Sequence, residues 1–220
     1  MWIVHFLHKV FEAVFDAVLP LRARTARTRA LNAEDVPLDP TAHDLLCTQI
    51  TTLMNYRERA VADLIQSLKY DGSRHAARIA ATVVADYLRE EIASHQTFSQ
   101  KKVLIVPVPS HPTRMRERGF NQIELVLRAL PTEFKDGTIA TLRNDVLVRS
   151  RDTKQQTRLA RSERLSNVAG AFALRDGVDI RNVAVYLIDD VTTTGATLTN
   201  AATPLRCAGA SVTLLALARA

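Results

Sequence analysis

Two adjacent carboxylates, Asp189 and Asp190, stand at the end of an apolar run in the segment VYLIDDVTTTGAT, residues 185–197. The apolar, β-branched residues 183–188 before them predict a buried strand. In parallel α/β sheets, ligands bind beyond the carboxyl ends of the strands. Carboxylates at such an end can accept hydrogen bonds from sugar hydroxyls, each contributing about 1.5–3 kcal/mol. The alternative is that both acids are ordinary strand-end residues.

The loop that follows the acidic pair has the composition of a phosphate-binding turn. Its members are small or hydroxylated: Val191, Thr192, Thr193, Thr194, Gly195, Ala196 and Thr197. A glycine lets the backbone curl so that several N–H groups point inward, and the positive end of a following helix dipole favours an anion. Thr197 as a simple helix N-cap is the alternative. Acids and loop together predict a site for a phosphorylated sugar.

The elements that must position this site alternate between helices and strands. Helical spacing and a Tyr-Asp-Gly stop predict one helix from about residue 58 to 71, and a second helix follows it. Buried or short strands are predicted at residues 101–109, 145–148, 171–174, 183–188 and 211–217, and further helices at 121–130 and 197–207. This alternation predicts an α/β fold with a mostly parallel sheet covered by helices on both faces.

Composition and charge restrict the class of protein. The 220 residues carry a formal charge of +6, which favours anionic partners such as nucleotides, pyrophosphate or nucleic acid without selecting one. Only Cys47 and Cys207 occur, far apart, so a disulfide framework and a cysteine-rich zinc site are not expected. A reducing, cytoplasmic location fits.

The N-terminal 55 residues differ from the rest of the chain. Apolar residues at helical spacing within 1–20, interrupted by charges, predict an amphipathic helix packed on the protein, with a membrane-surface helix as the alternative and no membrane span. An arginine- and proline-containing stretch after Pro20 reads as an exposed linker, or as an arm that touches nucleic acid. The predicted division is an appendage of residues 1–55 and a main domain of residues 56–220.

Three ordered segments carry a resemblance to a known family. The segment at 185–197 resembles the 5-phosphoribosyl-1-pyrophosphate (PRPP) binding motif of type I phosphoribosyltransferases. VPVPSHPTRMRERGFNQIEL (106–125) and RSRDTKQQTRLARSERLSNVAGAF (149–172) are similar to segments of the ComF family within that superfamily, which is associated with DNA uptake in competent bacteria. The resemblance covers roughly residues 56–220 and implies a type I phosphoribosyltransferase-like fold.

The resemblance implies that PRPP is bound with Mg²⁺, held mainly by PRPP and water rather than by protein side chains. Asp189 and Asp190 would then be the catalytic acids that grip the ribose hydroxyls, and residues 191–197 would cradle its 5-phosphate. Pyrophosphate or the second substrate would meet cations of the loop after residue 105 and of a flap-like stretch at 149–167: Arg114, Arg118, Arg149, Arg151, Gln156 and Arg164. A solvated basic turn, or a nucleic-acid-binding strip, is the alternative for these arginines.

Two functions remain open at this stage. The first is transfer of phosphoribosyl from PRPP to an unknown nitrogen acceptor, a glycosyltransferase reaction. The second is a non-catalytic competence factor that binds nucleic acid or a DNA-uptake helicase. Many ComF-like proteins begin with a cysteine-rich zinc segment, whereas this chain has only Cys47 there, so no zinc is expected. The acceptor and the oligomeric state are not readable from the sequence.

Overall fold

The computed structural model describes residues 23–96, 101–149 and 170–220. The predicted amphipathic helix within residues 1–20 lies outside these residues, as do Arg151, Gln156, Arg164 and most of the flap-like stretch. Within the described part, no helix combines the length and the apolar character that crossing a membrane requires.

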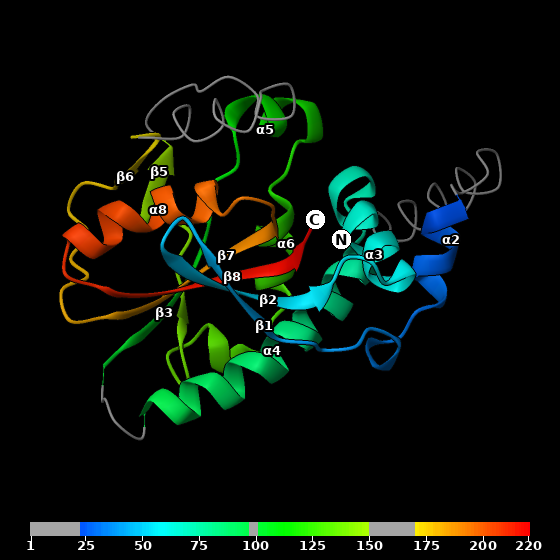
Figure 1. Cartoon of the computed structure of the whole chain (residues 1–220), viewed down its shortest axis with the longest axis horizontal. Helices are drawn as coiled ribbons and strands as arrows, with labels where there is room; N and C mark the ends of the chain where they lie inside the picture. Colours follow the sequence, from blue (N-terminus) through cyan, green and yellow to red (C-terminus); the bar gives the residue numbers. More distant parts are fainter. Residues whose placement is uncertain (1–22, 97–100, 150–169) are drawn as a thin grey trace, which may run out of the picture.

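A six-stranded sheet forms the centre of the molecule (Figure 1). Its strands, in spatial order, are β1 (Thr41–Leu45), β2 (Thr48–Asn55), β8 (Ser211–Arg219), β7 (Ala184–Thr192), β3 (Val103–Pro107) and β4 (Thr141–Leu142). All neighbouring pairs are parallel except β1 with β2. A separate antiparallel pair joins β5 (Leu147–Arg149) to β6 (Phe172–Leu174). The predicted α/β fold with a mostly parallel sheet is therefore confirmed.

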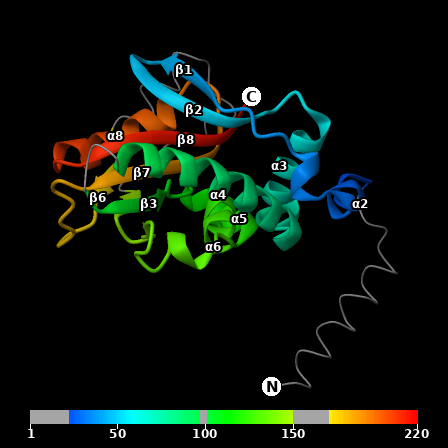
Figure 2. The ribbon, with the colours of Figure 1, turned by 90° about the horizontal axis from the view of Figure 1, so that it is seen from below.

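Helices cover both faces of the sheet, as the view in Figure 2 shows. One face packs against α3 (Arg59–Asp71), α4 (Arg74–Gln96) and α6 (Gln122–Arg128), and the other against α8 (Ala196–Cys207). The short helix α5 (Pro112–Arg118) follows β3, and single 3-10 turns lie at Ala33–Asp35 and Thr132–Phe134. Two apolar clusters, one on each face, therefore make up the core.

The predicted helices and strands of the main domain form close to their predicted positions. Helix α3 ends at Gly72, whose φ of 57° is the left-handed conformation that a helix-terminating glycine supplies. Helix α6 begins after Asn121, whose side-chain oxygen accepts a hydrogen bond from the Ile123 N–H at 3.2 Å. Strand β7 is longer than predicted, because it continues through the acidic pair to Thr192.

The predicted appendage boundary at residue 55 is wrong for residues 41–55. Strand β2 pairs in parallel with β8 from Thr51 to Asn55, and β1 pairs with β2, so both strands belong to the main sheet. Their connection has φ of 53° at Leu46 and 56° at Cys47, a primed turn built without glycine. The sheet of the main domain thus begins at Thr41.

The arginine-rich stretch that was read as an exposed linker also forms a packed helix, α2 (Ala23–Ala30). The Arg27 guanidinium donates two hydrogen bonds to the Asp63 carboxylate of α3, at 2.6 and 2.8 Å. The hydroxyl of Thr28, which is buried, lies 2.9 Å from that of Ser67. These partners lie 36 and 39 residues away in the sequence, so the composition of the stretch could not predict that it packs on α3.

Candidate functional site

The acidic pair lies at the carboxyl end of the central strand β7, next to a cavity of about 350 Å³. The cavity is lined by the acidic pair, by the whole Thr/Gly loop, by the loop after β3 and by residues of α3, α5, α6 and β5: Lys69, Val108, Pro109, Ser110, His111, Arg114, Gln122, Arg149, residues 189–197 and Ala220. The structure therefore brings the predicted carboxylates, the predicted phosphate loop and two of the predicted arginines to one place.

Asp190 is held by three groups from the protein itself. Its Oδ2 accepts a hydrogen bond from Gln122 Nε2 at 2.8 Å and lies 3.2 Å from Lys69 Nζ, and its Oδ1 accepts from the Val191 N–H at 2.7 Å. Burial alone would raise the pKa of Asp190, but the Lys69 charge and these hydrogen bonds outweigh it and lower the pKa. Asp190 is thus a fixed carboxylate at neutral pH.

Asp189 lies in a different electrostatic environment. Burial, followed by the negative charge of Asp190, raises its pKa to about 7, although the Asp190 N–H, Lys69 and Arg114 act in the opposite direction. Its Oδ1 accepts the Asp190 N–H at 2.9 Å. A carboxyl group that is half-ionised near neutrality is one that hydroxyl donors or a cation brought by a ligand would stabilise as the anion.

The Thr/Gly loop curls tightly between β7 and α8. Gly195 has a φ of 80° and is the N-cap residue of α8, whereas Thr197 lies inside the helix, so the N-cap interpretation of Thr197 is wrong. A Cβ at Gly195 would lie 2.7 Å from Ile50 Cδ1 and 2.9 Å from Leu45 Cβ. The loop therefore presses against the β1–β2 hairpin so closely that only glycine fits there.

The predicted arginines separate into two groups. Arg114 and Arg149 line the cavity, and Arg149 also lies over the Phe172 ring at 5.0 Å. Arg118 is absent from the lining residues and instead lies over the ring of Tyr70, 5.5 Å from its centroid. The prediction that Arg118 meets the ligand directly therefore does not match its position, since its guanidinium is engaged on the aromatic face.

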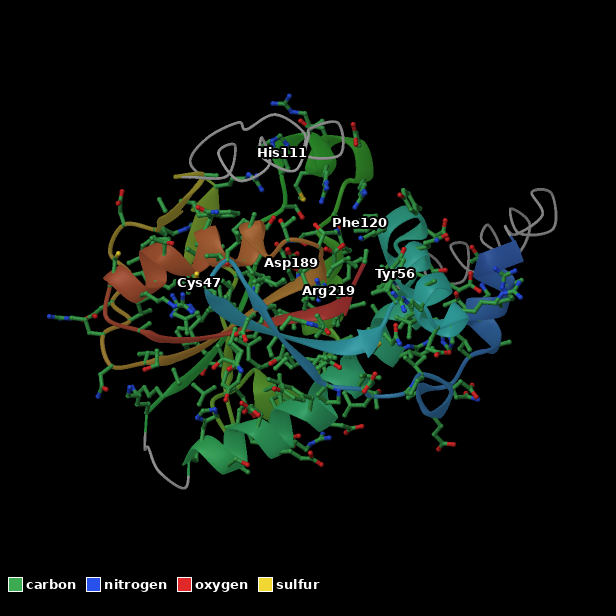
Figure 3. All side chains as sticks on the ribbon, viewed as in Figure 1. Cys47, Tyr56, His111, Phe120, Asp189 and Arg219 are labelled. Atoms are coloured by element: carbon green, nitrogen blue, oxygen red, sulfur yellow. The ribbon has the colours of Figure 1, made fainter. Side chains whose placement is uncertain are left out.

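Sequence reasoning missed three residues of the site. Asp190 contacts Lys69 of α3 and Gln122 of α6, which lie 121 and 68 residues before it in the sequence. His111, which also lines the cavity, is the N-cap of α5 and accepts a hydrogen bond from the Thr113 N–H through Nδ1 at 3.2 Å. Figure 3 labels His111 and Asp189 among the side chains of this region. In the sequence, Lys69 directly precedes the Tyr-Asp-Gly helix stop, and nothing local connects it with the acidic pair.

The chemistry of the lining suits an anionic ligand with a sugar. The carboxylate oxygens of the acidic pair can accept hydrogen bonds from hydroxyls or ligate Mg²⁺, an ion that prefers oxygen ligands and keeps several waters. No cluster of three or more His, Cys, Asp or Glu arranged to hold a metal occurs among residues 23–96, 101–149 and 170–220.

Fold and site together define an α/β protein with a polar ligand cavity at the carboxyl edge of its sheet. Two curated proteins are similar in sequence. Competence protein F of Haemophilus influenzae is 32% identical over 161 residues, which are 71% of this chain and 67% of that protein. Competence protein ComFC of Streptococcus pneumoniae is 31% identical over 152 residues, which are 69% of this chain and 60% of that protein. The chain therefore belongs to the ComF family of competence proteins.

The comparison with the pneumococcal protein spans about three fifths of that protein's length. No protein-family model matches the chain. Solved structures with a similar course of the chain include a hypoxanthine phosphoribosyltransferase from Staphylococcus aureus in two crystal forms, 12% identical, with TM-scores of 0.38 and 0.34. These alignments cover 67% and 62% of this chain and 75% and 72% of the other.

Proposed function

We propose that this protein binds PRPP with Mg²⁺ in the cavity at the end of β7 and transfers its phosphoribosyl group to a nitrogen acceptor. The observation that carries the proposal is the convergence of the acidic pair, the complete Thr/Gly loop and Arg114 on one cavity of about 350 Å³. A protein that used this fold only as a scaffold would have no need for that combination of groups.

Each part of the cavity has a role in this proposal. The Thr/Gly loop and the amino end of α8 bind the 5-phosphate, and Arg114 and Arg149 bind the pyrophosphate. Asp189 accepts hydrogen bonds from ribose hydroxyls, while Asp190, already held by Lys69 and Gln122, fixes the negative potential beneath the sugar. Mg²⁺ bound to PRPP would neutralise part of the pyrophosphate charge.

Catalysis follows from the placement of charge around the anomeric carbon. Positive charge develops on the sugar as pyrophosphate leaves, and carboxylates fixed beside the sugar stabilise it without reorganising. Arginine forks around the leaving group stabilise the opposite charge. Binding both halves of PRPP in one cavity also aligns the bond to be broken.

The two halves of PRPP provide a sharp test of this assignment. Ribose 5-phosphate binding, measured by isothermal titration, should be lost in a Thr193→Ala/Thr194→Ala variant and retained in Arg114→Gln. Pyrophosphate binding should show the reverse pattern. Arg181→Gln, at an exposed ion pair with Asp179, is the matched control and should change neither. Equal losses of both ligands in both variants, with folding intact, would refute the division of the cavity.

The second candidate function is that of a competence factor acting on nucleic acid or a DNA-uptake helicase. The observation that favours it is family membership, since both similar curated proteins are named competence proteins. Nucleic-acid binding would weaken steeply with salt as phosphate contacts release counterions, whereas PRPP binding would depend on the divalent ion. Titration of a single-stranded oligonucleotide at two salt concentrations, with and without Mg²⁺, separates the two.

A further inference from the structure

A second cavity, of about 570 Å³, lies at the same edge of the sheet. It is lined by residues of β1, β2 and the end of β8, together with the segment after β2: Asp39, Thr41, His43, Thr52, Met54, Asn55, Tyr56, Arg57, Arg219 and Ala220. Ala220 lines both this cavity and the one with the acidic pair, and its N–H donates to the Thr192 carbonyl oxygen at 3.0 Å. The two cavities are therefore neighbours separated by the end of β8.

Strand register places this second cavity relative to the acidic pair. Arg219 of β8 is the register partner of Thr192 in β7 on one side and of Asn55 in β2 on the other. Since neighbouring strands lie about 5 Å apart, β2, which lines the second cavity, lies about 10 Å from β7 along the sheet edge. Figure 3 agrees, because Arg219 is labelled between Asp189 and Tyr56 in that view.

The order of strands puts the second cavity on the opposite side of β7 from α5, the helix that carries Arg114. The sequence of neighbours is β2, β8, β7, β3, and α5 follows β3. In a displacement at an anomeric carbon that inverts it, the nucleophile approaches from the face opposite the leaving group. A sugar held over β7 with its pyrophosphate toward β3 would thus present its free face toward β8 and β2.

The lining of the second cavity selects the charge of its ligand. Arg57 and Arg219 contribute two cationic side chains, and Asp39 is the one acidic side chain of the lining. Among the described residues, Arg57 lies within ion-pair distance of no carboxylate. Arg219 Nη1 donates to His43 Nδ1 at 2.9 Å. Because a guanidinium can only donate, His43 Nδ1 is the acceptor in this contact, and the ring proton lies on Nε2, 3.0 Å from Thr52 Oγ1. Burial, followed by the Arg219 charge, lowers the pKa of His43. The guanidinium of Arg219 is thereby held in place at the cavity.

We infer that this second cavity is the acceptor pocket and that it takes a nitrogen nucleophile carrying a carboxylate, with Arg57 and Arg219 binding the carboxylate. The inference rests on the proposed phosphoribosyl transfer. A bond forms between the acceptor nitrogen and the anomeric carbon, and the bond from that carbon to the pyrophosphate oxygen breaks. The oxygen keeps the electron pair, and the nitrogen releases its proton to water.

A matched pair of probes tests the charge requirement. The 220-residue chain is titrated with 4-aminobenzoate and with 4-aminobenzamide, which differ only in the anionic group, first alone and then with saturating PRPP and Mg²⁺. The benzoate should bind at least tenfold more tightly than the amide, the ratio that one charge-assisted contact supplies. In Arg57→Gln/Arg219→Gln this ratio should fall to about one. The control, Arg181→Gln/Arg206→Gln, removes the same charge from exposed positions and should leave the ratio unchanged.

The outcomes separate this inference from the proposed function. Absence of benzoate binding, equal affinity for the two probes, or an unchanged ratio in the Arg57/Arg219 variant would overturn the anionic acceptor pocket. Failure of PRPP to bind, with probe discrimination intact, would instead remove the transferase role and with it the role of the cavity as an acceptor site. A circular dichroism spectrum of each variant establishes that it is folded before the titration.

Discussion

Gly195 is where the phosphate loop and the β1–β2 hairpin come closest, and its replacement by alanine gives a quantitative test of that packing. The φ of 80° is strained for any residue with a Cβ, at a cost of about 1–2 kcal/mol. The new Cβ would also overlap Ile50 Cδ1 at 2.7 Å and Leu45 Cβ at 2.9 Å. Overpacking of a closed core costs a further 1–3 kcal/mol or so. We expect Gly195→Ala to lower the free energy of unfolding by about 2–5 kcal/mol.

Gly177 supplies the matched control for this substitution. Its φ of 78° is nearly the same, but a Cβ there would meet no heavy atom of the described residues within 4 Å. Gly177→Ala should therefore lose only the backbone part, about 1–2 kcal/mol. The difference between the two variants isolates the overlap with the hairpin.

Urea denaturation followed by circular dichroism measures both losses. Adding Ile50→Val to Gly195→Ala removes the closest contact atom and should recover part of the overlap energy, so the double variant should be more stable than the sum of the single losses predicts. Equal losses for Gly195→Ala and Gly177→Ala, or purely additive behaviour with Ile50→Val, would refute the claim that the hairpin presses on the loop.

Three further predictions concern charged groups. Lys69→Met should lower the free energy of unfolding by about 1–3 kcal/mol, because it leaves Asp190 buried without its cation. Lys69→Arg keeps the charge and should lose less stability. Urea or thermal unfolding measures both losses, and equal losses would contradict the role of the charge. Because the pKa of Asp189 is raised to about 7, the folded state holds its proton to a higher pH than the unfolded chain does, so this group stabilises at low pH and that contribution is lost as the pH rises through about 7. The stability of the wild type relative to Asp189→Asn should therefore fall between pH 4 and 8, and a flat difference would contradict the shift. Asp63→Asn should weaken the bidentate contact with Arg27 and make α2 easier to cleave in limited proteolysis, whereas an unchanged cleavage rate would contradict its docking on α3.

The sequence was sufficient to predict the elements whose patterns are local. The apolar run before Asp189, the helix that ends at Gly72 and the Asn121 cap each depend on residues within one element. The composition of residues 191–197 likewise predicted a tight turn before a helix, which the structure places at the cavity. Each of these features can be recognised from residues that are close to one another in the sequence.

The parts that were missed depend on distant partners or unusual turns. The β1–β2 hairpin lacks an Asn-Gly or Asp-Gly turn, since Leu46 and Cys47 adopt the positive φ values themselves, and β1 is mostly exposed. Helix α2 looks like a linker until Asp63 is placed beside Arg27. Lys69 and Gln122 reach the site because α3 and α6 pack beside the end of β7, a long-range arrangement that the local sequence does not encode.

The central claim is that the acidic pair and the Thr/Gly loop form a PRPP site, and calorimetric titration of PRPP tests it most directly. The titration compares wild type with and without Mg²⁺ and an Asp189→Asn/Asp190→Asn variant, each first shown to be folded. PRPP should bind the wild type saturably and only with Mg²⁺, and this binding should be lost in the variant. Absence of binding by the folded wild type, or equal binding by the variant, would contradict it.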